Sequence, residues 1–282
     1  MQQTPLIDLQ SISYTYPSQS KESATPALAL NDVSLQAQQG EYIVLLGHNG
    51  SGKSTLARHC NALLVPTSGR ALIAGLDSAG QGNWRAIRET VGMIFQNPDN
   101  QIIATVVEVD VAWALTVRGL PAKEIKERVA WAMQAVGIAH LRGMPPGKLS
   151  GGQKQRLAIA GVLALRPQCI IADEATAQLD PLARQEIVAL LHQLNKDFGL
   201  TIIQVTHLLE EAALAQRIVV MERGRIVMEG TPPQVFADLE RLRALKLAIP
   251  EPLALAARLR NAGFRISPVA LTVEAIAQEL LH

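Results

Sequence analysis

The chain has 282 residues, 48% of them apolar, and its 26 Lys and Arg residues nearly balance 25 Asp and Glu residues, giving a net charge of +1. This length and composition predict a main domain with a large core and a smaller appended module. The near-neutral charge, without a basic tract, argues against a nucleic-acid-binding protein that works by bulk electrostatics.

The first residues of the chain, its apolar runs and its cysteines indicate where the protein works. The first ten residues lack the positive start and apolar core of a signal peptide. No uninterrupted apolar run reaches membrane-spanning length, about 18 residues. Cys60 and Cys169 lie in apolar segments, which is typical of core packing and not of a disulfide or a metal site. We therefore expect a cytosolic globular protein.

Short apolar runs alternate with helix-like stretches along the chain, the pattern of a mainly parallel α/β sheet. The runs that predict strands are residues 42–46, 91–95, 169–172 and 201–206. A hairpin is predicted over residues 217–228, with its turn at Arg223-Gly224.

Helices are predicted after several of these strands. The segment after residue 46 carries Leu56, Cys60 and Leu63 on one side. Residues 123–139 have apolar residues at helical spacing and could belong to a helical subdomain. A third helix is predicted from Asp180-Pro181, an N-cap and a first-turn proline, to a glycine stop at Gly199.

The pattern changes after Gly230-Thr-Pro-Pro233. The remaining residues carry helical stripes that Pro250 and Gly263 interrupt. These features predict a separate C-terminal module that begins at about Thr231.

Residues 47–54 read GHNGSGKS and fit the P-loop pattern between a strand and a helix. Its glycines let backbone amides wrap phosphates, and the following helix N-terminus adds a partial positive charge. Lys53 is expected to reach the β- and γ-phosphates, and the Ser54 hydroxyl to ligate Mg²⁺. A plain glycine-rich turn is disfavoured because motif and context agree. The predicted nucleotide-binding residues here are Gly47, Asn49, Gly50, Ser51, Gly52, Lys53, Ser54 and Thr55.

Two adjacent carboxylates, Asp173 and Glu174, follow the predicted strand 169–172. They lie at the end of the strand where α/β sheets bind ligands. Since neighbouring strand residues point to opposite sides, the two side chains are expected to have different tasks. Asp173 suits the Mg²⁺ shell, and Glu174 suits polarising the attacking water. An exposed acidic pair at a strand end is the alternative.

Residues 149–153 read LSGGQ and precede a helix-like run. Ser150 and Gln153 fit a capping box, in which each side chain satisfies a free backbone amide. However, each glycine in a helical turn costs roughly 1 kcal/mol relative to alanine. Gly151 and Gly152 therefore favour the approach of an anion to bare backbone at the helix N-terminus. We favour phosphate contact by Ser150, Gly151, Gly152 and Gln153 over a plain helix cap.

Four further residues have an ordinary alternative when each is taken alone. Gln96 could touch Mg²⁺ or the attacking water, or simply end a strand. His207 could be catalytic or structural, and Asp180 could contact nucleotide or cap a helix. Tyr16, before Pro17, could stack on adenine or pack against its neighbours.

Together, these motifs occur in the order seen in ATP-binding-cassette (ABC) ATPases, which the chain resembles across residues 5–230. The resemblance implies an α/β, RecA-like P-loop NTPase fold for residues 1–230, with a helical subdomain at about 97–165. Residues 231–282 would be a small helical or mixed C-terminal module for dimerisation or regulation. The implied cofactors are ATP and Mg²⁺.

The same resemblance implies roles for individual residues. Tyr16 would stack on adenine, Gln96 would form the Q-loop that contacts Mg²⁺ and water, and His207 would contact the γ-phosphate. Asp180 would end the D-loop, residues 177–180. Ser150 and Gly152 would contact the γ-phosphate that a second subunit holds, so a dimer is implied.

A narrower resemblance is to the ATPase subunit of energy-coupling-factor (ECF) transporters. It is carried by FQNPDNQ at 95–101, LSGGQKQR at 149–156 and DEATAQLDP at 173–181, and by the C-terminal tail. The FQNPDNQ and DEATAQLDP segments favour the first of the two ATPase subtypes, which in many of these transporters pair with each other. The resemblance implies a peripheral ATPase on the cytoplasmic face of the membrane, powering import of vitamins or transition-metal ions. The implied partners are a second ECF ATPase subunit in a hetero- or homodimer, a membrane coupling subunit and a substrate-specific membrane subunit, and no nucleic acid.

The chain departs from this pattern at Val109, where an acid is expected beside Asp110, and at Trp113-Ala114, which replaces Phe-Gly. Asp99, Glu108 and Asp110 either receive an arginine of the coupling subunit or are solvated surface carboxylates. Three other functions stay open: the ATPase of a conventional ABC importer, a soluble ABC ATPase in translation or DNA repair, and a P-loop kinase, which would transfer phosphate to a small molecule and not to water. The tail argues against the first, and a single cassette without a long coiled coil argues against the second.

Overall fold

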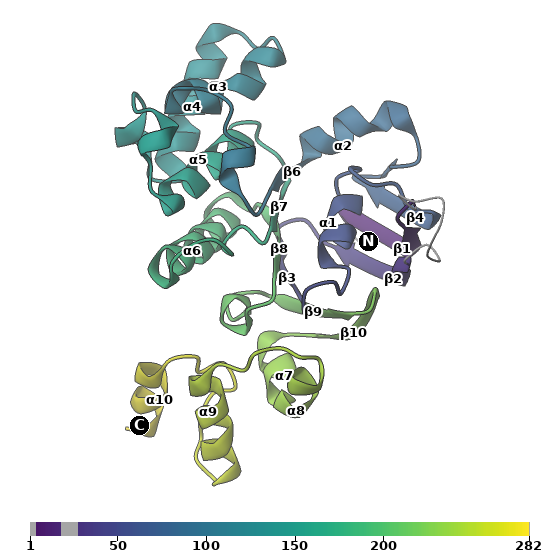
Figure 1. Cartoon of the computed structure of the whole chain (residues 1–282), viewed down its shortest axis with the longest axis vertical. Coiled ribbons are helices and arrows are strands. Elements are labelled where there is room, and N and C mark those ends of the chain that lie inside the picture. Colours follow the sequence, from purple (N-terminus) through teal and green to yellow (C-terminus); the bar gives the residue numbers. More distant parts are fainter. Residues whose placement is uncertain (1–3, 18–27, 282) are drawn as a thin grey trace, which may run out of the picture.

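A computed structural model of the protein describes residues 4–17 and 28–281. Its central feature is a sheet with the strand order β10-β9-β3-β8-β7-β6, in which only the edge pair β9–β10 is antiparallel (Figure 1). The strands are β3 (Tyr42–Leu46), β6 (Val91–Ile94), β7 (Cys169–Asp173), β8 (Thr201–Thr206), β9 (Arg217–Glu222) and β10 (Arg225–Gly230). The predicted parallel sheet and the hairpin turning at Arg223-Gly224 are confirmed.

Alternation along the buried strands places the two faces of the central sheet in two different apolar clusters. In β3, Tyr42 and Val44 belong to one apolar cluster, and Ile43 and Leu45 belong to the other. Successive strand residues point to opposite faces of a sheet, so both faces of this sheet are covered. That burial explains why its strands are continuous apolar runs.

The second sheet is antiparallel and was not predicted. It has the order β2-β1-β4-β5 and consists of β1 (Ile7–Thr15), β2 (Leu28–Ala37), β4 (Ser68–Ile73) and β5 (Leu76–Asp77). Its apolar face shares a cluster with Ile43 and Leu45 of the central sheet, and with Leu56 and Cys60 from the P-loop helix. That helix, α1 (Lys53–His59), therefore lies between the two sheets (Figure 1).

Helices cover the other face of the central sheet and extend beyond its edge. They are α3 (Val107–Val117), α4 (Ala122–Ala135), α5 (Gly151–Leu163) and α6 (Pro181–Phe198). Helix α2 (Trp84–Thr90) lies instead on the side of α1 and the second sheet, where Ile87 belongs to their shared cluster. Helices α3, α4 and α5 pack against one another as a group at the β6 edge (Figure 1). Short 3₁₀ helices cover Gln81–Asn83, Pro98–Asn100, Ala139–Leu141, Pro146–Lys148 and Leu209–Ala212.

Two predicted helices differ in detail from those observed. The helix predicted over residues 123–139 ends at Ala135, because Gly137 adopts a φ of +77° that breaks the helix. In the P-loop helix, Leu56 and Cys60 are buried as predicted, but Leu63 lies beyond the helix and is 40% exposed. The predicted boundaries of α6 are confirmed, with Asp180 as N-cap and Gly199 in the left-handed conformation.

After β10 the chain forms four more helices: α7 (Pro232–Ala237), α8 (Leu239–Ala244), α9 (Glu251–Asn261) and α10 (Val273–Leu280). Val235, Phe236 and Leu242 are buried in the same cluster as the central sheet. Ile266 and Ile276 belong to a small separate cluster. Within residues 4–17 and 28–281, no helix is long and apolar enough to cross a membrane.

Candidate functional site

The P-loop connects β3 to α1 and is held against the second sheet. Gly52 is the N-cap of α1 with a φ of +104°, and a Cβ at this position would lie 2.8 Å from the carbonyl oxygen of Ala29. The amide of Gly224, in the β9–β10 turn, donates to the carbonyl of Ser51 at 2.9 Å. Glycine at position 52 is therefore required by both conformation and space.

Lys53 is buried, and its ammonium group is directed into the P-loop. Its Nζ donates to the carbonyl oxygens of Gly47 at 2.7 Å and His48 at 3.0 Å. Burial lowers the pKa of Lys53, and the nearby carboxylates of Glu174 and Asp173 partly offset that effect. The site therefore holds a desolvated cation next to a loop of backbone amides, an arrangement suited to phosphate.

Ser54 and Asp173 meet although they come from different elements. The Ser54 hydroxyl donates to Oδ1 of Asp173 at 2.7 Å. Burial raises the pKa of Asp173, and the Ser54 hydrogen bond and the charge of Arg58 oppose that rise. Hydroxyl and carboxylate oxygens are the ligands that Mg²⁺ prefers, and it is usually held by one or two carboxylates together with substrate phosphates. The pair therefore fits a Mg²⁺ ion shared with a nucleotide.

Glu174 follows directly but is no longer part of the strand. Its φ is +49°, a left-handed conformation that is strained for glutamate, while its amide donates to the carbonyl of Val205 at 3.1 Å. The expectation that Asp173 and Glu174 point to opposite sides of a strand is wrong, because β7 ends at Asp173 and both residues line one pocket. Strained conformations of this kind cluster at active sites.

The P-loop, β6 and β7 together form a pocket of about 460 Å³. Its lining includes four residues that the sequence singled out: Ser54, Gln96, Asp173 and Glu174. It also includes four that sequence reasoning missed: Arg58, Phe95, Asn97 and Asn100. Arg58 had only its position in the P-loop helix as a signal, whereas the other three belong to the FQNPDNQ segment.

Gln101 was also missed, and it holds the Gln96 loop in place. Its side chain accepts from the amide of Phe95 at 2.8 Å and donates to the carbonyl of Met93 at 3.2 Å. Among the described residues, β6 is the edge strand of the central sheet, so its outer backbone groups have no neighbouring strand there. The amide side chain of Gln101 takes the place of that strand, which determines where Gln96 emerges.

The LSGGQ segment forms the predicted capping box at the start of α5. The Ser150 hydroxyl accepts from the Gln153 amide at 3.3 Å, and the Gln153 side chain accepts from the Ser150 amide at 3.0 Å. A Cβ at Gly151 would lie 3.3 Å from Leu179, and one at Gly152 would lie 3.2 Å from Ala183. Both glycines thus permit close packing against the D-loop and α6, a reason within the chain that sequence reasoning did not foresee.

LSGGQ is separate from the pocket that the P-loop forms in the same chain. None of residues 149–153 lines that pocket. Gly151 instead lines a small cavity of about 90 Å³ shared with the Gln96 loop and the D-loop. An ion pair of 2.8 Å between Lys154 and Asp99 joins the same two segments at the surface. The chain alone therefore does not bring its LSGGQ segment to its own P-loop.

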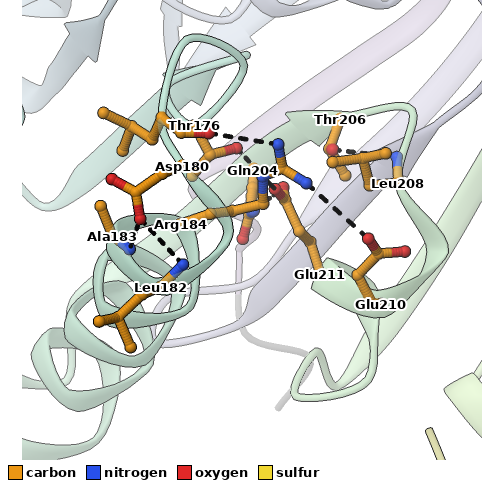
Figure 2. A network of polar contacts seen from close by, with 11 residues as sticks. Thr176, Asp180, Leu182, Ala183, Arg184, Gln204, Thr206, Leu208, Glu210 and Glu211 are labelled. Carbon is orange, nitrogen blue, oxygen red and sulfur yellow. Dashed lines mark hydrogen bonds and ion pairs between the residues drawn. The ribbon is translucent and has the colours of Figure 1, made fainter. Parts of the chain in front are cut away.

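The remaining predicted residues lie around these elements. Asp180 caps α6, accepting from the amides of Leu182 at 3.1 Å and Ala183 at 3.0 Å (Figure 2). Tyr16 follows β1 and lies beside the P-loop helix, where its hydroxyl is 3.1 Å from the hydroxyl of Thr55. His207 follows the carboxyl end of β8. In the sheet, β8 lies between β3, which leads into the P-loop, and β7, which ends at Asp173.

Comparison with known proteins agrees with this arrangement. Residues 30–177, more than half of the chain, match the family model described as ABC transporter. The post-hydrolysis structure of the ATP-binding cassette MJ0796, described as dimeric and bound to ADP and Pi, superimposes with a TM-score of 0.71 at 29% identity. It covers 80% of this chain and 98% of that one. The chain therefore belongs to the ABC transporter family and is an ABC-type ATPase with the corresponding P-loop fold.

Similarity to one branch of the family extends over nearly the whole chain. The energy-coupling factor transporter ATP-binding protein EcfA1 of Symbiobacterium thermophilum is 49% identical over 277 residues, covering 98% of this chain and 96% of that protein. The structure of cbiO1 from Clostridium perfringens, described as part of the ABC transporter complex cbiONQ, has a TM-score of 0.77 at 35% identity. It covers 92% of this chain and 100% of that one. Within the family, the chain groups with the ECF ATP-binding subunits of the first subtype.

Proposed function

We propose that this chain hydrolyses ATP to power an ECF-type importer of vitamins or transition-metal ions. It would act on the cytoplasmic face of the membrane, in a dimer with a second ATPase subunit. A membrane coupling subunit and a substrate-specific membrane subunit would complete the transporter. Similarity to ECF subunits across both the cassette and the C-terminal helices supports this assignment.

The observation that carries the proposal is the division of the site within one chain. Ser54, Gln96, Asp173 and Glu174 line a common pocket, and Lys53 is buried in the adjoining loop. The LSGGQ segment does not line that pocket, yet it presents a helix N-terminus suited to an anion. Two such chains placed head to tail would each supply the segment that the other one lacks.

In this mechanism, each residue has a role that its position supports. The P-loop amides and Lys53 bind the β- and γ-phosphates, and Tyr16 stacks on adenine. Ser54, Asp173 and Gln96 would hold Mg²⁺, which when bound neutralises charge on the phosphates. Asp180 lies where the D-loop would meet a partner chain. Ser150, Gly151, Gly152 and Gln153 bind the nucleotide of that partner.

Glu174 accepts a proton from water as the water oxygen bonds to the γ-phosphorus. The bond between that phosphorus and the β–γ bridging oxygen breaks at the same time, and ADP leaves with the electron pair. His207 donates a hydrogen bond to the γ-phosphate oxygens, and Gln96 orients the water. The products are ADP and inorganic phosphate.

Isolation of the transporter tests the proposal. The full-length tagged chain is purified from membranes in mild detergent, and the co-purifying proteins are identified by mass spectrometry. We expect an integral coupling subunit and a second ATPase in stoichiometric amounts. Recovery only with ribosomes or DNA, without integral membrane subunits, would contradict the transporter assignment.

Transport assays address the substrate. Cells lacking the chain are expected to lose uptake of one labelled vitamin or transition-metal ion, and the wild-type chain should restore it. The Lys53→Ala variant should not restore it, because it lacks the ammonium group that binds phosphate. Normal uptake of all such solutes in the deleted strain would contradict the proposed cargo.

A further inference from the structure

A buried polar network lies beside the proposed catalytic residues, and Glu211 is at its centre (Figure 2). Glu211 is in the 3₁₀ helix Leu209–Ala212 and is only 2% exposed. Its Oε1 accepts from the Thr176 hydroxyl at 2.6 Å, and its Oε2 accepts from the side-chain amide of Gln204 at 2.7 Å. Both carboxylate oxygens are thus engaged by side chains from other elements.

The network continues on both sides of the carboxylate. The hydroxyl of Tyr42, at the start of β3, donates to the Gln204 side chain at 2.5 Å. On the other side, Nε of Arg184 in α6 lies 3.8 Å from Oε1 of Glu211. Burial, together with the charge of Glu211, raises the pKa of Tyr42. The tyrosine therefore stays a hydrogen-bond donor at physiological pH.

Stability alone does not explain a charge at this position. Removing a carboxylate from water costs several kcal/mol by rough estimate, and apolar replacements of buried ion pairs are often neutral or stabilising. The adjacent residue provides a contrast. Glu210 also lies near Arg184, at 3.9 Å, but its side chain is 46% exposed, and the Thr176 hydroxyl donates to Glu211 instead. Only Glu211 reaches across to the neighbouring loop.

The contacts of Glu211 join two segments that carry predicted catalytic residues. Thr176 lies two positions after Glu174, in the loop that leads to Asp180. Glu211 lies four positions after His207, on the loop that follows β8. The backbone of Glu174 is itself bonded to Val205 of β8. The carboxylate therefore ties the loop of Glu174 to the loop of His207.

We propose that Glu211 is a positioning residue for ATP hydrolysis, which holds the Glu174–Asp180 loop in register with the loop of His207. The inference rests on the proposed roles of Glu174 and His207. Misplacing a reacting group by about 1 Å can cost roughly 100-fold in rate. A hydrogen bond two residues from Glu174 controls displacements of that size. The nucleotide-binding P-loop is outside the network, so ATP affinity should not depend on it.

Steady-state ATPase kinetics of the full-length chain, isolated in its complex, test the proposal. Glu211→Gln keeps the size of the side chain but removes the charge and one acceptor. We expect kcat to fall roughly 10- to 100-fold, with KM for ATP unchanged within about twofold. Glu210→Gln is the matched control and should keep the wild-type kcat.

A second pair of variants tests the same hydrogen bond from the Thr176 side, so that a folding defect in Glu211→Gln does not decide the result. Thr176→Val keeps the shape of the side chain but cannot donate to Glu211, whereas Thr176→Ser keeps the hydroxyl. We expect kcat to fall in the valine variant and to be restored in the serine variant. Thermal unfolding midpoints recorded in parallel ensure that all assays are run on folded protein.

The possible results separate this inference from the proposed function. If Glu174→Gln hydrolyses ATP normally, the role of Glu174 is refuted, and the positioning role of Glu211 with it. If Glu174→Gln is inactive but Glu211→Gln and Thr176→Val keep wild-type kcat, only the inference about Glu211 is overturned. A lower unfolding midpoint with unchanged kcat in both variants also overturns it, because the network would then be purely structural.

Discussion

Residues far apart in the sequence form the candidate site. The Ser54 hydroxyl and the Asp173 carboxylate are 119 positions apart, yet they share a hydrogen bond of 2.7 Å. Parallel strands bring this about, because their carboxyl ends lie at one edge of the sheet. At the same edge, Glu174 adopts a backbone conformation that its residue type disfavours. Strain at this position is consistent with a side chain placed for chemistry.

The role of Glu174 makes a direct prediction. Glu174→Gln removes the group that accepts the proton of water, so kcat should fall by roughly 10²–10⁴-fold, the contribution of a positioned base. ATP binding should persist, and an ATP-bound dimer should accumulate. Phosphate release assays and size-exclusion chromatography with ATP measure the two effects. Near-normal hydrolysis would remove Glu174 from the role of base.

At the scale of elements, α5 contains three glycines in different surroundings. Gly151 and Gly152 face Leu179 and Ala183, whereas a Cβ at Gly161 would meet no heavy atom within 4 Å in the described part of the chain. The first two glycines thus permit the helix to pack against the D-loop. No packing reason of this kind applies to the third.

This difference predicts opposite responses to alanine. Gly161→Ala should raise the free energy of unfolding by about 0.5–1 kcal/mol, because alanine loses less backbone entropy in a helix. Gly152→Ala should raise the free energy of unfolding by less, or should lower it. The added Cβ at position 152 would lie 3.2 Å from the Cβ of Ala183. Urea unfolding of the two variants measures this. Equal stabilisation by both would show that packing at Gly152 is not tight.

Gln101 gives a second prediction for an element. Gln101→Leu leaves the Phe95 amide and the Met93 carbonyl at the edge of β6 without their side-chain partners. The free energy of unfolding should fall by about 0.5–1.5 kcal/mol for each lost hydrogen bond, because both bonds are only partly buried. Ile103→Ala, at a nearby residue that is 59% exposed, is the control. An equal loss in both variants would contradict a specific role for Gln101.

For the whole molecule, the separation of LSGGQ from its own pocket predicts shared sites between chains. In homodimers assembled from a mixture of Ser150→Ala and Lys53→Ala copies of this chain, some dimers combine both defects in one composite site and leave the other site intact. Such mixtures should therefore recover part of the ATPase activity that each variant lacks alone. Activity that stays at the level of the separate variants would place each complete site within a single chain.

Local patterns were sufficient to predict several parts of the fold. The apolar runs of β3, β7 and β8 are confirmed because a strand that is buried on both faces must be apolar throughout. The cap at Asp180 and the stop at Gly199 are confirmed because capping depends on nearby residues. The antiparallel sheet was missed, since its strands mix exposed and buried residues and are interrupted by register shifts.

By itself, the sequence determined the class of protein: its P-loop, LSGGQ and Asp173-Glu174 segments indicated an ABC ATPase of the ECF type, and the family assignment is confirmed. Such motifs can be recognised in a sequence because phosphate binding needs particular residues at fixed local spacing. Only the tertiary structure showed that Glu211 reaches Thr176 and that Gly152 packs on Ala183. Those contacts depend on how strands and helices from distant segments come together, which no local spacing encodes.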